Sequence, residues 1–314
     1  MSNMFKVVIL ISFLYATNCA ETPIIGILTQ PSDYYDYDTF IAASYVKFVE
    51  SAGARVIPIW INQSIEYYER VVSYTNGVLF PGGAASLVQP GGYGDTAKII
   101  YRLAVNLNKE GNYYPIWGTC LGFEVIPYVE VGVDTVVNCS VSIGGQSLNF
   151  KRDFRESRLF QNLSEEIFEI LSSKNVTYNY HDYCLTSNSL FDYGIFDWKI
   201  ITTNKDNNGL EYISTMENLK YPFYAVQYHP EKNGYEFAEG YHFPHEVYSI
   251  KIMQYYANFF VHETRKNQNS FPNTELVLKS LIYNYNTKFS GRDQNYYYMM
   301  YGFYETDYEN NQLV

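Results

Sequence analysis

Apolar runs alternate with helical repeats along the first part of the chain. Residues 23–28 are continuously apolar, which is typical of a strand buried on both faces of a sheet. Apolar side chains then recur at helical spacing over residues 41–52, and Gly53 follows where a helix favours a C-terminal glycine. Residues 55–60 are again apolar and β-branched. This order predicts a strand, a helix and a second strand.

The same alternation continues as far as residue 130. Residues 65–74 have the pattern of a helix that ends before Asn76-Gly77, and residues 78–80 make a short apolar strand. A helix is predicted over residues 95–109 and a strand over 114–117. A further helical run starts after Cys120.

The second part of the chain has a different pattern. Residues 131–158 contain short β-like pieces, and a helix is predicted around residues 165–171. Residues 177–184, 198–203 and 210–216 alternate like strands, and the polar turn at 205–209 predicts a hairpin between the last two. Residues 221–228 are apolar and aromatic, and a long amphipathic helix is predicted over 246–266.

These elements together predict an α/β fold. We expect a mainly parallel twisted sheet with helices on both faces and an antiparallel part late in the chain. Ligands of such sheets bind at the carboxyl ends of the strands. Gly82, Gly83, Cys120 and His229 each follow a predicted strand, so we expect them to meet in one crevice.

Length and composition favour one large domain. The chain has 314 residues, of which 47% are hydrophobic, and this is enough for a full core. Residues 1–20 have a lysine, a short apolar run and a small residue at the end, which is typical of a signal peptide. No other run is long enough to cross a membrane. We expect a catalytic domain over residues 21–268 and a polar, Tyr-rich, partly ordered tail over 269–314.

The cysteines and asparagines agree with the secretory pathway. Cys19 lies in the predicted leader, so three cysteines remain, and at least one is free or pairs between chains. Cys139 and Cys184 could form a bridge, which would leave Cys120 free. Four triplets fit N-glycosylation, although such triplets are also common by chance in Asn-rich chains; they begin at Asn62, Asn138, Asn162 and Asn175.

Charge and histidine spacing bear on the partners. The net charge of −11 and the lack of a basic patch argue against nucleic acid, but they do not bear on a small anionic substrate. His242 and His245 flank Pro244, which would break the helix needed to align them as metal ligands. We therefore expect no metal and no cofactor.

Cys120 is the candidate for the central chemistry. It lies between Gly118 and Gly122 at a strand-to-helix turn, where a nucleophile can stand out above a sheet. The first turn of the following helix would lower the thiol pKa. The alternative is a small buried hydrophobic residue, as most free cysteines are.

His229 and Glu231 could complete a catalytic group with this cysteine. They lie two residues apart on an extended segment, so both side chains can point to one face. A histidine moves protons for a thiol nucleophile, and a carboxylate orients the imidazole. Backbone N–H groups near Gly83 and Leu121 would form an oxyanion hole. For Gly82 and Gly83 the alternative is an ordinary tight turn.

Three stretches carry a resemblance to a known family. They are the Gly-Thr-Cys-Leu-Gly-Phe-Glu run around Cys120, Phe-Pro-Gly-Gly-Ala around Gly82, and Gln-Tyr-His-Pro-Glu-Lys around His229. Together they resemble the class I glutamine amidotransferase-like superfamily, and specifically its gamma-glutamyl hydrolase family. The resemblance covers about residues 22–265 and fades in the middle section and the tail.

The resemblance implies a function and roles for particular residues. It implies a cysteine hydrolase that cleaves γ-glutamyl peptide bonds of folate polyglutamates, with Cys120 as nucleophile, His229 as general base and acid, and Glu231 as third member. His181 matches a second histidine that the family uses, and Glu124 also falls at a family position, with a helix-surface or capping carboxylate as the alternative. A homodimer without metal, in the lysosome, vacuole or extracellular space, is expected. The alternative function is an inactive secreted binding or storage protein of the same fold.

Overall fold

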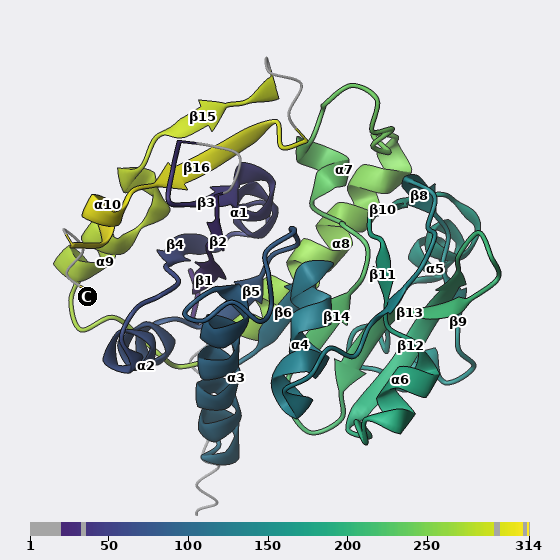
Figure 1. Ribbon diagram of the computed structural model, residues 1–314, viewed down its shortest axis with the longest axis horizontal. Helices are drawn as coiled ribbons and strands as arrows, with labels where there is room; N and C mark the ends of the chain where they lie inside the picture. The colour runs from purple at the N-terminus through teal and green to yellow at the C-terminus, as the bar shows by residue number, and fades with distance from the viewer. Residues whose placement is uncertain (1–19, 33–35, 292–295, 310–312, 314) are drawn as a thin grey trace, which may run out of the picture.

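The computed structural model describes residues 20–32, 36–291, 296–309 and 313 (Figure 1). The predicted signal peptide lies outside the described residues, apart from Ala20. Among those residues, no helix combines the length and the apolar character that crossing a membrane requires.

An eight-stranded sheet forms the centre of the molecule, and five of its strands are parallel. Each of the five is buried over nearly its whole length, as the continuous apolar runs predict. In spatial order they are β4 (Arg55–Ile59), β1 (Ile24–Leu28), β5 (Gly77–Phe80), β6 (Ile116–Thr119) and β14 (Phe223–Val226).

The remaining three strands continue this sheet in antiparallel pairing. They are β13 (Glu211–Asn218), β12 (Trp198–Lys205) and β9 (Asn149–Phe150). β12 and β13 form the predicted hairpin across the polar turn. The prediction of a mainly parallel sheet with a late antiparallel part is confirmed.

Helices pack on both faces of the sheet (Figure 1). One group, in mutual contact, is α2 (Ile65–Tyr74), α3 (Tyr93–Lys109) and α4 (Leu121–Val131). The other group is α1 (Ala43–Glu50), α5 (Glu165–Ser173), α7 (Lys232–Tyr235) and α8 (Val247–Thr264). The short α6 (Ser187–Asp192) precedes β12.

Local sequence explains where several helices begin and end. The Ser64 hydroxyl accepts the Tyr67 N–H and so caps the start of α2. After α1, Gly53 has a φ of +87°, a backbone conformation that glycine adopts without strain.

The predicted strand over residues 177–184 is two strands with different partners. β10 (Thr177–Asn179) pairs with β8 (Gly144–Gln146), whereas β11 (Tyr183–Cys184) pairs with β7 (Val137–Asn138). Residues 180–182 lie in the gap between them. His181 is therefore on a short loop and not within a strand.

The described part of the chain after residue 269 folds against the rest of the molecule. A four-stranded antiparallel sheet joins it to the N-terminal part through pairing of β16 with β3. Ile282, Met300 and Phe303 of this segment are buried in the core. The sheet contains β15 (Thr287–Phe289), β16 (Met299–Phe303), β3 (Thr39–Ala42) and β2 (Gln30–Pro31).

The sequence pattern gave no elements in this segment because tyrosines and polar residues hide its apolar period. It also contains the helices α9 (Thr274–Ser280) and α10 (Glu305–Glu309) and the short 3-10 turn η2 (Ile282–Asn284). Another 3-10 turn, η1 (Phe154–Glu156), lies earlier in the chain. The domain boundary at residues 268 and 269 stays a prediction.

Candidate active site

Cys120 lies at the sharp turn between β6 and α4. Its backbone has φ 53° and ψ −109°, a strained conformation for a residue with a Cβ. A Cβ on Gly122 would lie 1.9 Å from the Phe80 carbonyl oxygen, and one on Gly118 would lie 2.3 Å from the Gly122 carbonyl oxygen. The glycines on both sides of the cysteine are thus required by close backbone packing.

His229 and Glu231 follow the neighbouring strand β14. β14 pairs in parallel with β6, and the Cys120 N–H donates to the Val226 carbonyl at 2.9 Å. The carboxyl ends of the two strands therefore bring the cysteine and the histidine to the same edge of the sheet. His229 Nδ1 lies 2.7 Å from Glu231 Oε1, and both side chains are buried.

Gly82 lies between the cysteine and the histidine. A Cβ at this position would be 2.8 Å from Cys120 Cβ and 2.6 Å from His229 Cε1. The Gly82 N–H donates to the Tyr45 hydroxyl at 2.8 Å, and its carbonyl accepts from Gln30 Nε2 at 2.7 Å. Gly82 therefore leaves room for the two side chains, and its own polar groups are already paired.

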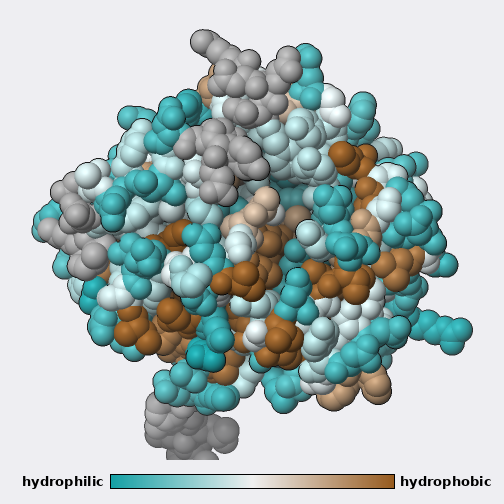
Figure 2. Space-filling model, in the orientation of Figure 1, coloured by the Kyte–Doolittle hydropathy of each residue, from teal (hydrophilic) through white to brown (hydrophobic). Residues whose placement is uncertain are grey.

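A cavity of about 900 Å³ opens over this group. Six of the predicted site residues line it: Gly83, Cys120, Leu121, Glu124, His181 and His229. Glu231 and Gly82 are not in the lining, but Glu231 contacts His229, and Gly82 lies against Cys120 and His229. The space-filling view shows separate hydrophobic clusters among hydrophilic residues across the middle of one face (Figure 2).

Burial governs the charge state of Cys120. Desolvation raises the pKa of its thiol well above the usual value, and the nearby Glu124 and Glu231 act in the same direction. A hydrogen bond from the Leu121 N–H and the charge of Lys232 lower it. The pKa decrease expected from the helix terminus is therefore outweighed by the burial of the thiol.

The other ionisable groups of the cavity respond to burial in the same way. Burial raises the pKa of Glu124 to about 8, against the hydrogen bond that Gln227 Nε2 donates to it at 2.9 Å. Burial also lowers the pKa of His229, although Glu231 opposes this. His229 is thus neutral at neutral pH and able to accept a proton.

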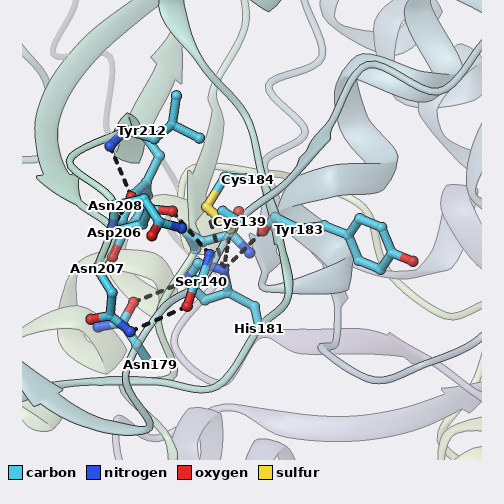
Figure 3. Close-up of a disulfide and its surroundings, with 12 residues drawn as sticks. Cys139, Ser140, Asn179, His181, Tyr183, Cys184, Asp206, Asn207, Asn208 and Tyr212 are labelled. Carbon is cyan, nitrogen blue, oxygen red and sulfur yellow. Dashed lines mark hydrogen bonds between the residues drawn. A yellow bond between two sulfur atoms is a disulfide. The ribbon is translucent and has the colours of Figure 1, made fainter.

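His181 is held at the cavity wall beside a disulfide (Figure 3). Its Nδ1 lies 2.8 Å from the Tyr183 carbonyl oxygen, and burial lowers its pKa to about 4. Cys139 and Cys184 form the disulfide, with both sulfurs 3.9 Å from His181 Nδ1. The bridge considered from the sequence is confirmed, and Cys120 is the free cysteine of the described part of the chain.

These three side chains also form a cluster of possible metal ligands within 4.8 Å of one another. Both sulfurs are joined in the disulfide, so they offer no thiolate to a metal ion. The sequence prediction that the site uses no metal stays a prediction.

Several residues of the site were missed by sequence reasoning. Tyr45 lies on α1, with its hydroxyl 3.2 Å from His229 Nδ1. Tyrosines from three distant segments line the cavity, namely Tyr180, Tyr241, Tyr296 and Tyr297. Because these segments meet only in the folded chain, no local spacing marks them. Lys232 follows Glu231 directly in the sequence, so its position next to the motif could have indicated that it belongs to the site.

The asparagines of the four predicted glycosylation triplets are all exposed: Asn62, Asn138, Asn162 and Asn175. Each is accessible as an acceptor must be. Their modification stays a prediction.

Comparisons with known proteins give consistent results. The family model for Peptidase C26 matches residues 23–231. The chain is 39% identical to gamma-glutamyl hydrolase of Bos taurus over 278 residues, which is 86% of each protein. It is 36% identical to gamma-glutamyl hydrolase B of Dictyostelium discoideum, over 93% of this chain and 86% of that protein. With gamma-glutamyl hydrolase of Homo sapiens it shares 38% over 87% of each. The chain belongs to the Peptidase C26 family.

Proposed function

We propose that this protein is a cysteine hydrolase that cleaves γ-glutamyl peptide bonds in folate polyglutamates and similar poly-γ-glutamates. The observation that carries the proposal is that Cys120 and His229 line one cavity and that Glu231 holds the His229 ring, in a chain similar to gamma-glutamyl hydrolases over most of its length. The substrate class comes from the names of these relatives. A γ-glutamyl bond presents a carbonyl carbon that a thiolate can attack.

The first half of the reaction forms a thioester. His229 accepts the Cys120 thiol proton, and the sulfur attacks the γ-carbonyl carbon. Glu231 holds the ring through Nδ1, which leaves Nε2 for the proton transfer. The tetrahedral intermediate collapses as His229 gives the proton to the leaving amine nitrogen.

The second half releases the acid. Water attacks the thioester carbonyl while His229 takes one of its protons, and the thiol leaves with that proton. The N–H groups of Gly83 and Leu121 would hold the negative oxygen in both halves, since both residues line the cavity. Loss of one such donor typically costs about 3 kcal/mol of transition-state stabilisation.

His181 and Glu124 would contact the substrate. Both line the cavity and are neutral at neutral pH because of burial, so they can exchange hydrogen bonds with substrate groups without bringing in a charge. The intact catalytic group argues against the alternative of an inactive binding or storage protein.

Substitution of the nucleophile tests the proposal. Cys120→Ala should abolish glutamate release from a folate pentaglutamate, whereas the far-UV circular dichroism should not change. His229→Gln should also abolish release, and His262→Gln, at an exposed position on α8, serves as the matched control with wild-type turnover. Wild-type turnover by Cys120→Ala would refute the nucleophile assignment. The product masses also distinguish removal of one glutamate from release of a longer block.

We further propose a homodimer that enters the secretory pathway and reaches the lysosome, vacuole or extracellular space. Exposure of the four acceptor asparagines supports the compartment. Deglycosylation by an amidase would reduce the apparent mass of the protein from its native source.

Light scattering tests the homodimer. It would give the mass of the dimer, and the mass of a monomer would contradict the proposed homodimer.

A further inference from the structure

Lys232 carries a buried amino group close to the proposed catalytic residues. It is the first residue of α7 and follows Glu231 directly. Its side chain is fully buried, and its Nζ has no hydrogen-bond partner among the described residues. A buried ammonium group is costly unless nearby groups compensate for its charge, and it is therefore rare without a role.

Three aromatic rings enclose this ammonium group. Nζ lies 4.0 Å from the centre of the Tyr296 ring, 4.7 Å from that of Tyr297 and 5.9 Å from that of Phe243. Aromatic faces attract a cation at such distances. Two of the rings belong to the C-terminal segment, which is also held here by the Tyr298 N–H donating to Glu236 Oε2 at 2.6 Å.

The charge of Lys232 acts on the catalytic group. Glu236, Glu231 and Cys120 are the groups whose negative charges favour its ammonium form, while burial lowers its pKa. In return, Lys232 lowers the pKa of the Cys120 thiol. Lys232 is not in the cavity lining and so does not compete for substrate, but Tyr296 and Tyr297, whose rings it contacts, line the cavity together with Cys120.

We propose that Lys232 is a positioning residue for the nucleophile: its caged ammonium group supplies the positive charge that stabilises the Cys120 thiolate beside the Glu231 carboxylate. The proposal deepens the proposed function and rests on Cys120 being the nucleophile. It also gives the C-terminal segment a part in the chemistry, because Tyr296 and Tyr297 hold the ammonium in place.

Other ionisable groups also face the sulfur and must be considered. Glu124 on α4 and Glu231 raise the pKa of the thiol, and His229, the proposed proton acceptor, is neutral because burial lowers its pKa. Tyrosines from three further segments have Cys120 among their electrostatic neighbours; they are Tyr45, Tyr93 and Tyr296. Burial raises the pKa of all three tyrosines, so they stay neutral over the range in which the proposal is tested.

The pH dependence of Cys120 alkylation by iodoacetamide tests the proposal. Lys232→Met and Lys232→Gln remove the charge, and the pH midpoint of alkylation should rise in both. At neutral pH the reaction should be about tenfold slower, since one pKa unit changes the thiolate fraction tenfold. Peptide mapping by mass spectrometry identifies the cysteine that reacts, and circular dichroism shows that each variant is folded.

Two further variants separate charge from packing. Lys232→Arg keeps the charge, and its midpoint should stay close to that of the wild type. Lys174→Met is the matched control, because Lys174 also lies over an aromatic ring, at 5.9 Å from the centre of Tyr248, but away from the cavity. It should alkylate like the wild type.

Unchanged midpoints in folded Lys232→Met or Lys232→Gln would overturn the proposal, since a merely structural residue would not shift the titration. Turnover gives a second readout: kcat should fall in the neutral variants while KM changes little. Alkylation needs no substrate. A wild type that releases no glutamate would therefore refute the proposed function without affecting the measured effect of Lys232 on the thiol.

Discussion

Around Cys120, several buried ionisable side chains are uncharged at neutral pH. Burial keeps the thiol protonated, and it keeps His181 and His229 neutral. Glu124 is also protonated below its pKa of about 8. The resting site can therefore hold its proton on sulfur until a substrate arrives, and in the proposed mechanism the transfer to His229 would accompany the attack.

The raised pKa of Glu124 leads to a prediction about activity at alkaline pH. Above about pH 8 its carboxyl ionises, and the new negative charge raises the pKa of the Cys120 thiol and repels anionic substrates. Wild-type kcat/KM should therefore decline as the pH rises through 8. Glu124→Gln should lack this decline, because the amide oxygen can still accept the hydrogen bond from Gln227 but cannot ionise.

Glu130→Gln is the matched control for this profile. Glu130 lies on the same helix and accepts a hydrogen bond from Trp198 Nε1 at 2.9 Å, but it is outside the cavity lining. It should keep the wild-type decline. The same decline in Glu124→Gln would show that another group causes it.

At the scale of elements, the loop that carries His181 depends on a covalent link. β7 and β11 pair through two residue pairs, and the Cys139–Cys184 disulfide joins them. Such a short ladder is weak by itself. The disulfide joins residues with a sequence separation of 45 and so reduces the conformational entropy of the unfolded chain. It also fixes one end of the cavity wall.

Removal of this disulfide should affect both stability and activity. Cys139→Ser with Cys184→Ser should lower the free energy of unfolding by about 2–4 kcal/mol. It should also lower kcat/KM, because His181 contacts both sulfurs. Urea denaturation and turnover measure the two effects. A dithiol reductant should reproduce the loss in the wild type and add nothing in the double variant; an equal effect on both proteins would contradict the prediction.

The elements differ in how well the sequence indicates them. β1, β5 and β6 are predictable because a strand buried on both faces needs an unbroken apolar run. The interruption between β10 and β11 at His181 is not predictable, because residues 177–184 alternate throughout and the two strands differ only in the strands with which they pair. Cys120 and His229 could be found because each follows such a strand, and Glu231 could be found from its spacing to His229.

At the scale of the whole molecule, the C-terminal segment and the N-terminal part form one sheet. β16 pairs with β3, and the same segment places Tyr296 and Tyr297 in the cavity lining. Trp60 of the first half packs against this segment, with its ring centre 5.0 Å from that of Tyr308. The sequence could not indicate this contact, because the residues that meet are far apart and rich in tyrosine.

Met300→Ala tests how far this segment stabilises the molecule. Met300 is fully buried in β16, so its truncation should cost about 2–5 kcal/mol of unfolding free energy. Leu278→Ala is the control, since Leu278 is 60% exposed on α9 and should change stability by no more than about 0.5 kcal/mol. Tryptophan fluorescence should show one cooperative urea transition; a separate early transition would show that the segment detaches by itself.

The pairing of β16 with β3 also bears on when a newly made chain becomes active. A ribosome makes Cys120, His229 and Glu231 well before it reaches residues 296–303. Until then the central sheet can form, but Lys232 lacks two of the rings that enclose it. The distant pairing closes late, since contacts of long sequence separation are slow to form. Hydrolytic competence would thus come as the final event of folding, after the catalytic residues have already met.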